Sequence, residues 1–174
     1  MRLLIFALCF WVCISTNAFG KVNKMKIVLP SDPTVVEVFA ANELARCMQA
    51  SVGWSVVRGS EKEKPESAVI FYVGSIDRKR MAEAGFPVEQ ITRATEKLAE
   101  DGAYIKGAKQ SVVLVGKGRR GALNAVYDFL ENTIGCHWPE PGREYIPKHE
   151  SISLEGISRK VSPTFYWRGI AIHG

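Results

Sequence analysis

The chain has 174 residues and carries 23 basic and 18 acidic side chains, which gives a formal net charge of +5 at pH 7. A chain of this length can bury a hydrophobic core without help from a metal or a partner. The basic residues alternate with acids, as in residues 61–64, and no basic stripe with interleaved aromatics is present, so we do not expect nucleic acid as a partner. No cysteine and histidine spacing is typical of zinc, and we expect neither a metal nor another cofactor.

The first 20 residues have the pattern of a secretory signal peptide. Arg2 supplies a positive charge, Leu3 to Ile14 is an unbroken apolar run, and small residues follow, with cleavage expected after Ala18 or Gly20. The apolar run is too short to span a bilayer comfortably. We therefore expect a secreted or periplasmic protein without membrane attachment once residues 1–20 are removed.

Two of the four cysteines leave with this segment, and Cys47 and Cys136 remain. Each lies on the apolar side or at the end of an expected helix. In an exported protein they could form one disulfide. They could equally remain two buried thiols, because pairing cannot be deduced from spacing.

The rest of the chain alternates between short apolar strands and amphipathic segments. In the first helix, apolar residues such as Val36 and Leu44 recur at helical spacing. The segment Ser31-Asp-Pro-Thr ahead of them gives a capping oxygen and a proline suited to the first helical turn. The pattern predicts strands at 25–29, 54–57 and 68–73, helices at 33–51, 76–84 and 87–99, a charged loop at 59–67, an antiparallel hairpin at 103–106 and 110–115, and a last strand at 151–154.

The stretch from Ser111 to Trp138 organises the other elements. Val112 to Val115 form a buried strand that ends at Gly116. A core-facing helix of about three to four turns follows, because apolar residues recur on one face, at Leu123, Val126, Leu130 and Ile134. Gly135 is typical of a helix end in the left-handed conformation.

The turn between this strand and helix contains Gly116, Gly118 and Gly121, which match the dinucleotide fingerprint letter for letter. Phosphate binding on the helix N-terminus would follow from that match. However, the fingerprint requires a following strand that ends in an acidic residue, and here the helix leads into a proline-rich segment. Lys117 and the two arginines after Gly118 would also crowd a close approach of the backbone. The glycines therefore serve to let the chain leave the strand.

Together these elements predict an α/β (α+β) sandwich with one mixed sheet of five or six strands and two main helices on one face. This domain would span residues 21–157, followed by a linker at 158–163. Residues 164–174 begin a new, aromatic-rich strand where the chain stops. We expect them to be the truncated first strand of a second domain.

Five segments carry a resemblance to a known family, namely 40–44, 101–106, 112–116, 120–131 and 135–147. They resemble the N-terminal domain that precedes the barrel in α-glucuronidase-like and β-hexosaminidase-like glycoside hydrolases. The similarity is greatest to secreted bacterial proteins in which a barrel-like DUF4838 region follows. It extends over residues 25–172.

The resemblance implies a (β/α)₈ barrel following in the same chain, a carbohydrate substrate, and a role in polysaccharide degradation. Catalytic groups lie at the C-terminal ends of barrel strands, so they would fall beyond Gly174, and we expect none in this chain. Arg168-Gly169 is similar to an Arg-Gly of the first barrel strand in the hexosaminidase-like relatives, where the arginine binds sugar hydroxyls. A purely structural ion pair is the alternative for Arg168.

A few other side chains could contact a sugar. Trp138 and Tyr145 could stack on a sugar ring, or could close the end of the domain against the following barrel. Glu140 and Glu144 lie in a loop, where carboxylates are usually solvated. Two hypotheses remain: a non-catalytic accessory domain of a glycoside hydrolase, and a free-standing carbohydrate-binding module.

Overall fold

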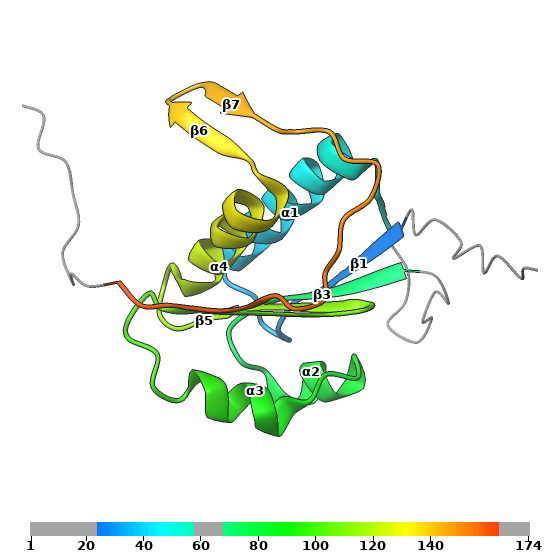
Figure 1. The fold of residues 1–174 in the computed structure, drawn as a ribbon. Helices are drawn as coiled ribbons and strands as arrows, with labels where there is room; N and C mark the ends of the chain where they lie inside the picture. Colours follow the sequence, from blue (N-terminus) through cyan, green and yellow to red (C-terminus); the bar gives the residue numbers. More distant parts are fainter. Residues whose placement is uncertain (1–23, 58–67, 164–174) are drawn as a thin grey trace, which may run out of the picture.

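The computed structural model describes residues 24–57 and 68–163 (Figure 1). The expected signal peptide at 1–20, the charged loop at 59–67, the strand at 164–174 and Arg168 lie outside these residues. No helix in the described part of the chain is both long and apolar enough to cross a membrane.

A six-stranded sheet forms the centre of the molecule, with strand order β2-β1-β3-β5-β4-β8. Its strands are β1 (Lys24–Val28), β2 (Ser55–Val56), β3 (Ala68–Gly74), β4 (Ala103–Ala108), β5 (Ser111–Gly116) and β8 (Ser158–Val161). Strands β2, β1, β3 and β5 are parallel, whereas β4 is antiparallel to both of its neighbours. The predictions of one mixed sheet and of a hairpin between β4 and β5 are confirmed.

Two long helices lie side by side on one face of the sheet (Figure 1). They are α1 (Val35–Val52) and α4 (Gly121–Phe129), which continues as the π-helical turn η1 (Leu130–Ile134). Phe129 packs edge-on against Phe71 of β3 with ring centroids 5.8 Å apart. This main core is filled by apolar residues of both helices and the sheet, which confirms that the two main helices cover one face.

The opposite face carries the short helices α2 (Arg78–Glu83) and α3 (Val88–Thr95) (Figure 1). Side chains alternate between the two faces along a strand. Phe71 therefore enters the main core, while Tyr72 enters a second, smaller core with Met81 and Ile91. The two faces of the sheet are buried by helices of different length.

Helix α1 begins at Val35, two residues later than predicted, and Thr34 is the member of the expected capping segment that caps it. Thr34 forms a capping box with Glu37. The amide of Glu37 donates to Thr34 Oγ1 at 3.2 Å, and the amide of Thr34 donates to Glu37 Oε2 at 2.8 Å. Ser31 lies upstream and makes its contacts elsewhere.

The last strand lies at 158–161 and not at 151–154, so that prediction was wrong. Residues 151–154 alternate polar and apolar side chains, as strands do, but they have no regular structure and bury only Leu154. The polar Ser158–Val161 pairs with β4 instead, as an edge strand with charged residues. Arg159 fixes it to α4 by donating to Asp128 at 2.6 Å. Residues 158–161, expected to be linker, are thus part of the sheet.

The proline-rich segment after η1, expected to be irregular, contains a two-stranded hairpin. Its strands are β6 (His137–Glu140) and β7 (Arg143–Tyr145). The hairpin stands above the helical layer, on the side away from the sheet (Figure 1).

Candidate functional site

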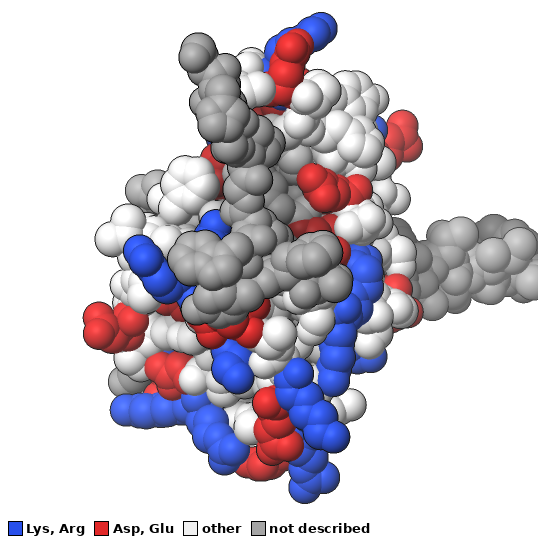
Figure 2. Space-filling model, turned by 90° about the vertical axis from the view of Figure 1, so that its left-hand side faces the viewer, with Lys and Arg blue, Asp and Glu red and all other residues white. Residues whose placement is uncertain are grey.

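The carboxyl ends of β1, β3 and β5 meet at one edge of the sheet. In open α/β sheets, ligands bind in the crevice outside the carboxyl ends of parallel strands. The helices α1, α2 and α4 begin at this edge, and their first backbone N–H groups are ready donors to an anion. This edge is therefore the place to look for a site, and Figure 2 shows the molecule from that side. Acidic and basic side chains are interspersed there, with Lys and Arg more frequent in the lower half.

At the start of α1 the anion position is filled by Glu37, which is only 5% exposed. Its Oε1 accepts from the amide of Ser75 at 2.5 Å, and its Oε2 accepts from the amide and the hydroxyl of Thr34 at 2.8 and 3.0 Å. Burial raises the pKa of Glu37, but these hydrogen bonds outweigh it, and the net pKa is lowered. Glu37 thus joins α1 to the loop after β3.

At the start of α2 the same role is taken by Asp77. Its Oδ1 accepts from the amide of Arg80 at 3.0 Å, and its Oδ2 accepts from the hydroxyl and the amide of Ser31 at 2.6 and 2.9 Å. The hydrogen bond from the Ser31 hydroxyl is the main cause that lowers the pKa of Asp77 to about 2. The loops after β1 and β3 are therefore joined across the crevice between those strands.

At the start of α4, where the glycine pattern suggested a phosphate, the position is filled by Asp101. This residue is 9% exposed and has a φ of 59°. Its Oδ1 accepts from the amide of Arg120 at 3.0 Å, its Oδ2 lies 3.2 Å from Arg120 Nε, and its carbonyl accepts from Asn124 at 2.8 Å. A carboxylate of the chain itself thus takes the place that a phosphate would occupy.

The fingerprint glycines have a packing role. A Cβ at Gly116 would lie 1.9 Å from the carbonyl carbon of Gly121, and one at Gly121 would lie 2.7 Å from the carbonyl carbon of Gly116. Gly118 has a φ of 72°, which few side chains tolerate. The pattern allows the end of β5 to touch the start of α4, which confirms the structural interpretation of these glycines.

Asp101→Asn is expected to lower the free energy of unfolding by about 1–2 kcal/mol. Asparagine tolerates positive φ and keeps one acceptor oxygen, but the charge at the helix N-terminus and the ion pair with Arg120 are lost. Urea denaturation followed by circular dichroism measures the change. Asp32→Asn, at an exposed loop position, is the matched control. Equal stability of the two variants would contradict the capping role.

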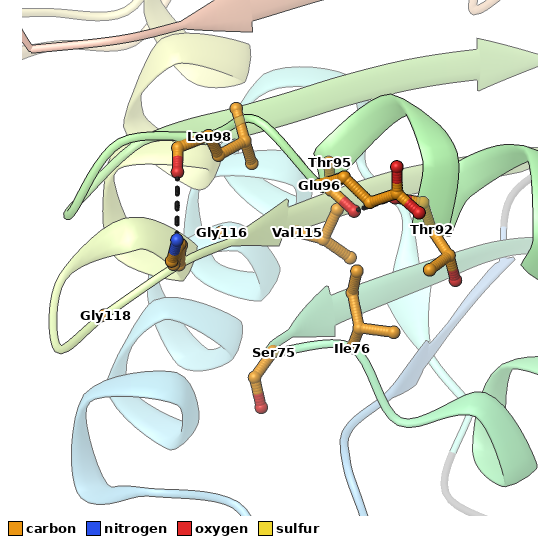
Figure 3. Close-up of a pocket in the computed structure, with 10 residues that line it drawn as sticks. Ser75, Ile76, Thr92, Thr95, Glu96, Leu98, Val115, Gly116 and Gly118 are labelled. Atoms are coloured by element: carbon orange, nitrogen blue, oxygen red, sulfur yellow. Dashed lines mark hydrogen bonds between the residues drawn. The ribbon is translucent and has the colours of Figure 1, made fainter.

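A pocket of about 350 Å³ lies on the α3 side of this edge (Figure 3). Ile76, Leu98 and Val115 give it apolar walls, and its polar groups come from Thr92, Glu96 and Lys117. Lys117 Nζ donates to the carbonyl of Leu98 at 3.2 Å. Of the described residues that line the pocket, Glu96 is the one carboxylate, so the pocket lacks the two carboxyl groups that glycoside hydrolysis needs.

The structure separates the two aromatic residues that were candidates for sugar contact. Trp138 is half-buried and packs edge-on against Tyr127 of α4, with ring centroids 4.8 Å apart. Tyr145 is 60% exposed and stacks on its strand partner His137. Tyr145 lies on the same face of the hairpin as its partner His137, whereas Trp138, the next residue in β6, points to the opposite face. Trp138 and Tyr145 therefore do not form one surface on which a sugar could stack.

The two carboxylates that were expected in a loop lie on β6 and β7, and both are paired with arginines. Glu140 forms an ion pair with Arg143. Glu144 accepts two hydrogen bonds from Arg46 of α1, both at 2.7 Å, and these lower the pKa of Glu144. Within residues 24–57 and 68–163, no three His, Cys, Asp or Glu side chains are grouped so that they could hold a metal.

The first half of α1 exposes a short apolar stripe. Val35, Val38 and Phe39 are 86%, 38% and 50% exposed. Residues three and four apart lie on one face of a helix, so these side chains are adjacent. We call Val35, Val38 and Phe39 the α1 stripe.

Of the two aromatic candidates that the sequence suggested, the structure leaves Tyr145 accessible to a ligand. The sequence did not identify the carboxylates Glu37, Asp77 and Asp101. The capping box of Thr34 and Glu37 was a readable signal for one of them. The contacts of Asp77 with Ser31 and of Asp101 with Arg120 cross 46 and 19 residues and leave no local pattern.

By its fold, the chain is a mixed α/β domain whose carboxyl edge is occupied by its own side chains. The model of the family described as Glycosyl hydrolase family 67 N-terminus matches residues 17–129, and the chain belongs to this family. The resemblance to the N-terminal domain of α-glucuronidase-like enzymes is thereby confirmed.

Solved structures that match part of the chain include two glycoside hydrolases. One is a GH138 enzyme targeting pectin rhamnogalacturonan II, with 14% identity and a TM-score of 0.42. The other is a GH115 4-O-methyl-α-glucuronidase with specificity for decorated arabinogalactans, with 13% identity and a TM-score of 0.45. Each match covers 63% of this chain and 13% of the other chain, so this chain spans a small part of their length. A search of curated proteins gave no match.

Proposed function

We propose that this chain is the non-catalytic N-terminal accessory domain of an exported glycoside hydrolase that acts in polysaccharide degradation, with the catalytic groups in a barrel that follows it. The observation that carries the proposal is the filling of the carboxyl edge. Glu37, Asp77 and Asp101 each accept a hydrogen bond from a backbone amide at the start of α1, α2 or α4, at the edge where an α/β enzyme would bind a ligand.

The carboxylates of Glu96, Glu140 and Glu144 also favour a structural role. Hydrolysis of a glycoside needs one carboxyl group as acid and a second as base or nucleophile across the scissile bond. Glu140 and Glu144 are each held by an arginine, and Glu96 is alone in its pocket. This arrangement supports a domain that positions its neighbour rather than one that performs chemistry.

The α1 stripe is the surface we assign to the contact with the following domain. Contiguous exposed apolar side chains on a helix typically mark an interaction surface. Phe39→Asp is expected to change the unfolding free energy of the 174-residue chain by no more than about 0.5 kcal/mol, because half of the Phe39 side chain is exposed to solvent. In the protein extended past Gly174, the same change is expected to lower the thermal midpoint or to separate the unfolding of the two domains.

Ala82→Asp is the matched control, since it puts the same charge on the exposed face of α2 across the sheet. If Phe39→Asp and Ala82→Asp have equal effects in the extended protein, the α1 stripe is not the contact.

The alternative function, a free-standing carbohydrate-binding module, is favoured by one observation, the exposed stack of Tyr145 on His137. Affinity electrophoresis of the chain in gels that contain plant polysaccharides distinguishes the two. The accessory-domain proposal expects no retardation. Retardation that Tyr145→Ala abolishes would favour the binding module.

Export to the periplasm or the medium is part of the proposal and rests on the pattern of residues 1–20. N-terminal sequencing of the chain from an exporting host tests it. We expect a mature N-terminus after Ala18 or Gly20, and an unprocessed chain in the cytoplasm would contradict export.

A further inference from the structure

The second half of α1 is clamped to the segment that follows η1. Ser51 Oγ donates to the carbonyl of Pro147 at 2.6 Å, and the amide of His149 donates to the carbonyl of Ser51 at 3.0 Å. Arg46 adds the bidentate contact with Glu144. These bonds connect positions that are about a hundred residues apart in the chain and fix α1 against the base of the β6–β7 hairpin.

Two cysteines lie in the part of the core that this clamp covers. Cys47 follows Arg46 on α1, and Cys136 directly precedes β6 in the two-residue connection from η1. Both have 0% exposure and belong to the main core. In the structure both are free thiols. They lie in the same core cluster, between the bonds that join Arg46 to Glu144 and Ser51 to Pro147, and each is among the groups that influence the pKa of the other.

We propose that Cys47 and Cys136 form a disulfide in the exported protein, which joins α1 to the base of the β6–β7 hairpin. The proposal rests on the proposed export, because disulfides form and persist in oxidising compartments and rarely in the cytosol. No other cysteine is present among the described residues, so this pairing has no competitor there.

The reaction is a thiol–disulfide exchange with a disulfide donor of the export compartment. The thiolate of one cysteine attacks the donor disulfide, so that a mixed disulfide forms and one donor thiolate leaves. The second cysteine, as thiolate, then attacks the mixed disulfide and releases the other donor thiolate. Cys47 and Cys136 lose two protons and two electrons in total, and the donor is reduced to a dithiol.

Because both thiols are buried in the folded protein, we expect the disulfide to form during folding. Burial raises the pKa of Cys47 to about 12 and also raises the pKa of Cys136. Thiolate is therefore scarce in the folded protein, and a donor cannot reach sulfur atoms with no exposure. The bond has to form before the core closes, and afterwards it is protected from reductants.

The bond would also close a long loop. The chain between the two cysteines contains β2 to α4, which is most of the sheet and three of the four α-helices. Closing a long loop removes more conformational freedom from the unfolded chain than closing a short one. A large effect on the unfolding midpoint is expected for that reason.

The test is made on the 174-residue chain expressed with its leader in an exporting host. The purified protein is denatured without reductant, alkylated and mapped by mass spectrometry. We expect no alkylated Cys47 or Cys136 and one peptide pair joined through them. The thermal midpoint of this protein is expected to be about 10 °C above that of the same protein reduced and refolded with a reductant present. Two alkylated cysteines in the exported, folded protein would overturn the proposal.

A second arm separates this proposal from the proposed export. If the chain is not exported, residues 21–174 are produced without the leader, so that Cys9 and Cys13 are absent, and are refolded from denaturant in a mixture of reduced and oxidised glutathione. Formation of the Cys47–Cys136 peptide pair there supports the pairing while export fails. Its absence contradicts the pairing itself. Cys47→Ser is the control, since it must leave Cys136 without a joined protein peptide in both arms, either alkylated or, in the refolding arm, bound to glutathione.

Discussion

Gly116→Ala is expected to destabilise the fold by on the order of 4 kcal/mol or more, a large part of the total stability of a domain of this size. The new Cβ would lie 1.9 Å from the carbonyl carbon and 2.3 Å from the carbonyl oxygen of Gly121. Both contacts are with backbone, so no side-chain rotation can relieve them. Strand β5 and helix α4 would have to separate, and both belong to the main core.

Urea denaturation measures this effect, and Gly142→Ala provides the comparison. Gly142 has a φ of 80° and open space around its Cβ position, so alanine there meets only the backbone preference, which costs about 1 kcal/mol. The Gly116→Ala protein should therefore be much less stable to urea than the Gly142→Ala protein, or should fail to fold. A Gly116→Ala protein as stable as Gly142→Ala would mean that the contact between β5 and α4 is not tight.

Glu37→Ala is expected to lower the free energy of unfolding by about 3 kcal/mol. The change leaves the amides of Thr34 and Ser75, whose hydrogen bonds are partly buried, without their acceptor and removes the capping box of α1. Glu89→Ala is the control, because Glu89 is exposed and pairs with Arg78 at the surface. A loss no larger than that of Glu89→Ala would contradict the role of Glu37.

The pH dependence of stability gives a second readout for Glu37. Its folded pKa lies below the ordinary value of 4.5, because the hydrogen bonds from Thr34 and Ser75 outweigh burial. Its contribution is therefore fully present above about pH 4.5 and is lost as the pH falls through the folded pKa. The unfolding free energy of Glu37→Ala should fall less steeply in that acidic range than that of the wild-type chain.

The glycine fingerprint shows what a sequence pattern can and cannot determine. Gly116, Gly118 and Gly121 match a phosphate-binding turn in every letter, and the context beyond the helix argued against that interpretation. The physical reason became visible only in three dimensions, where Asp101 occupies the N-terminus of α4. Asp101 and Arg120 are 19 residues apart, and a contact over that distance follows no sequence periodicity from which it could be predicted.

The strands show a similar division. Buried runs such as 68–73 and 112–115 could be predicted because strands covered on both faces are continuously apolar. The edge strand β8 could not, because only one of its sides pairs and its residues are polar. Residues 151–154 were predicted as a strand because they alternate polar and apolar side chains up to Leu154. Leu154 is buried, but the segment has no regular structure.

Strand pairing in the β6–β7 hairpin determines which of the two aromatic candidates, Trp138 or Tyr145, is exposed. The sequence could show that Trp138 and Tyr145 flank one proline-rich segment. It could not show that His137 would be the partner of Tyr145, which turns Trp138 to the opposite side against Tyr127. One candidate is therefore accessible and the other is part of the packing.

The most direct test of the accessory-domain proposal is hydrolysis of aryl α-glucuronides and glucuronoxylan oligosaccharides by two proteins, the 174-residue chain and the protein extended past Gly174. We predict hydrolysis by the extended protein alone, unchanged when Glu140 and Glu144 are both replaced by glutamine. Hydrolysis by the 174-residue chain itself would contradict the proposal, because the catalytic groups would then lie within this domain.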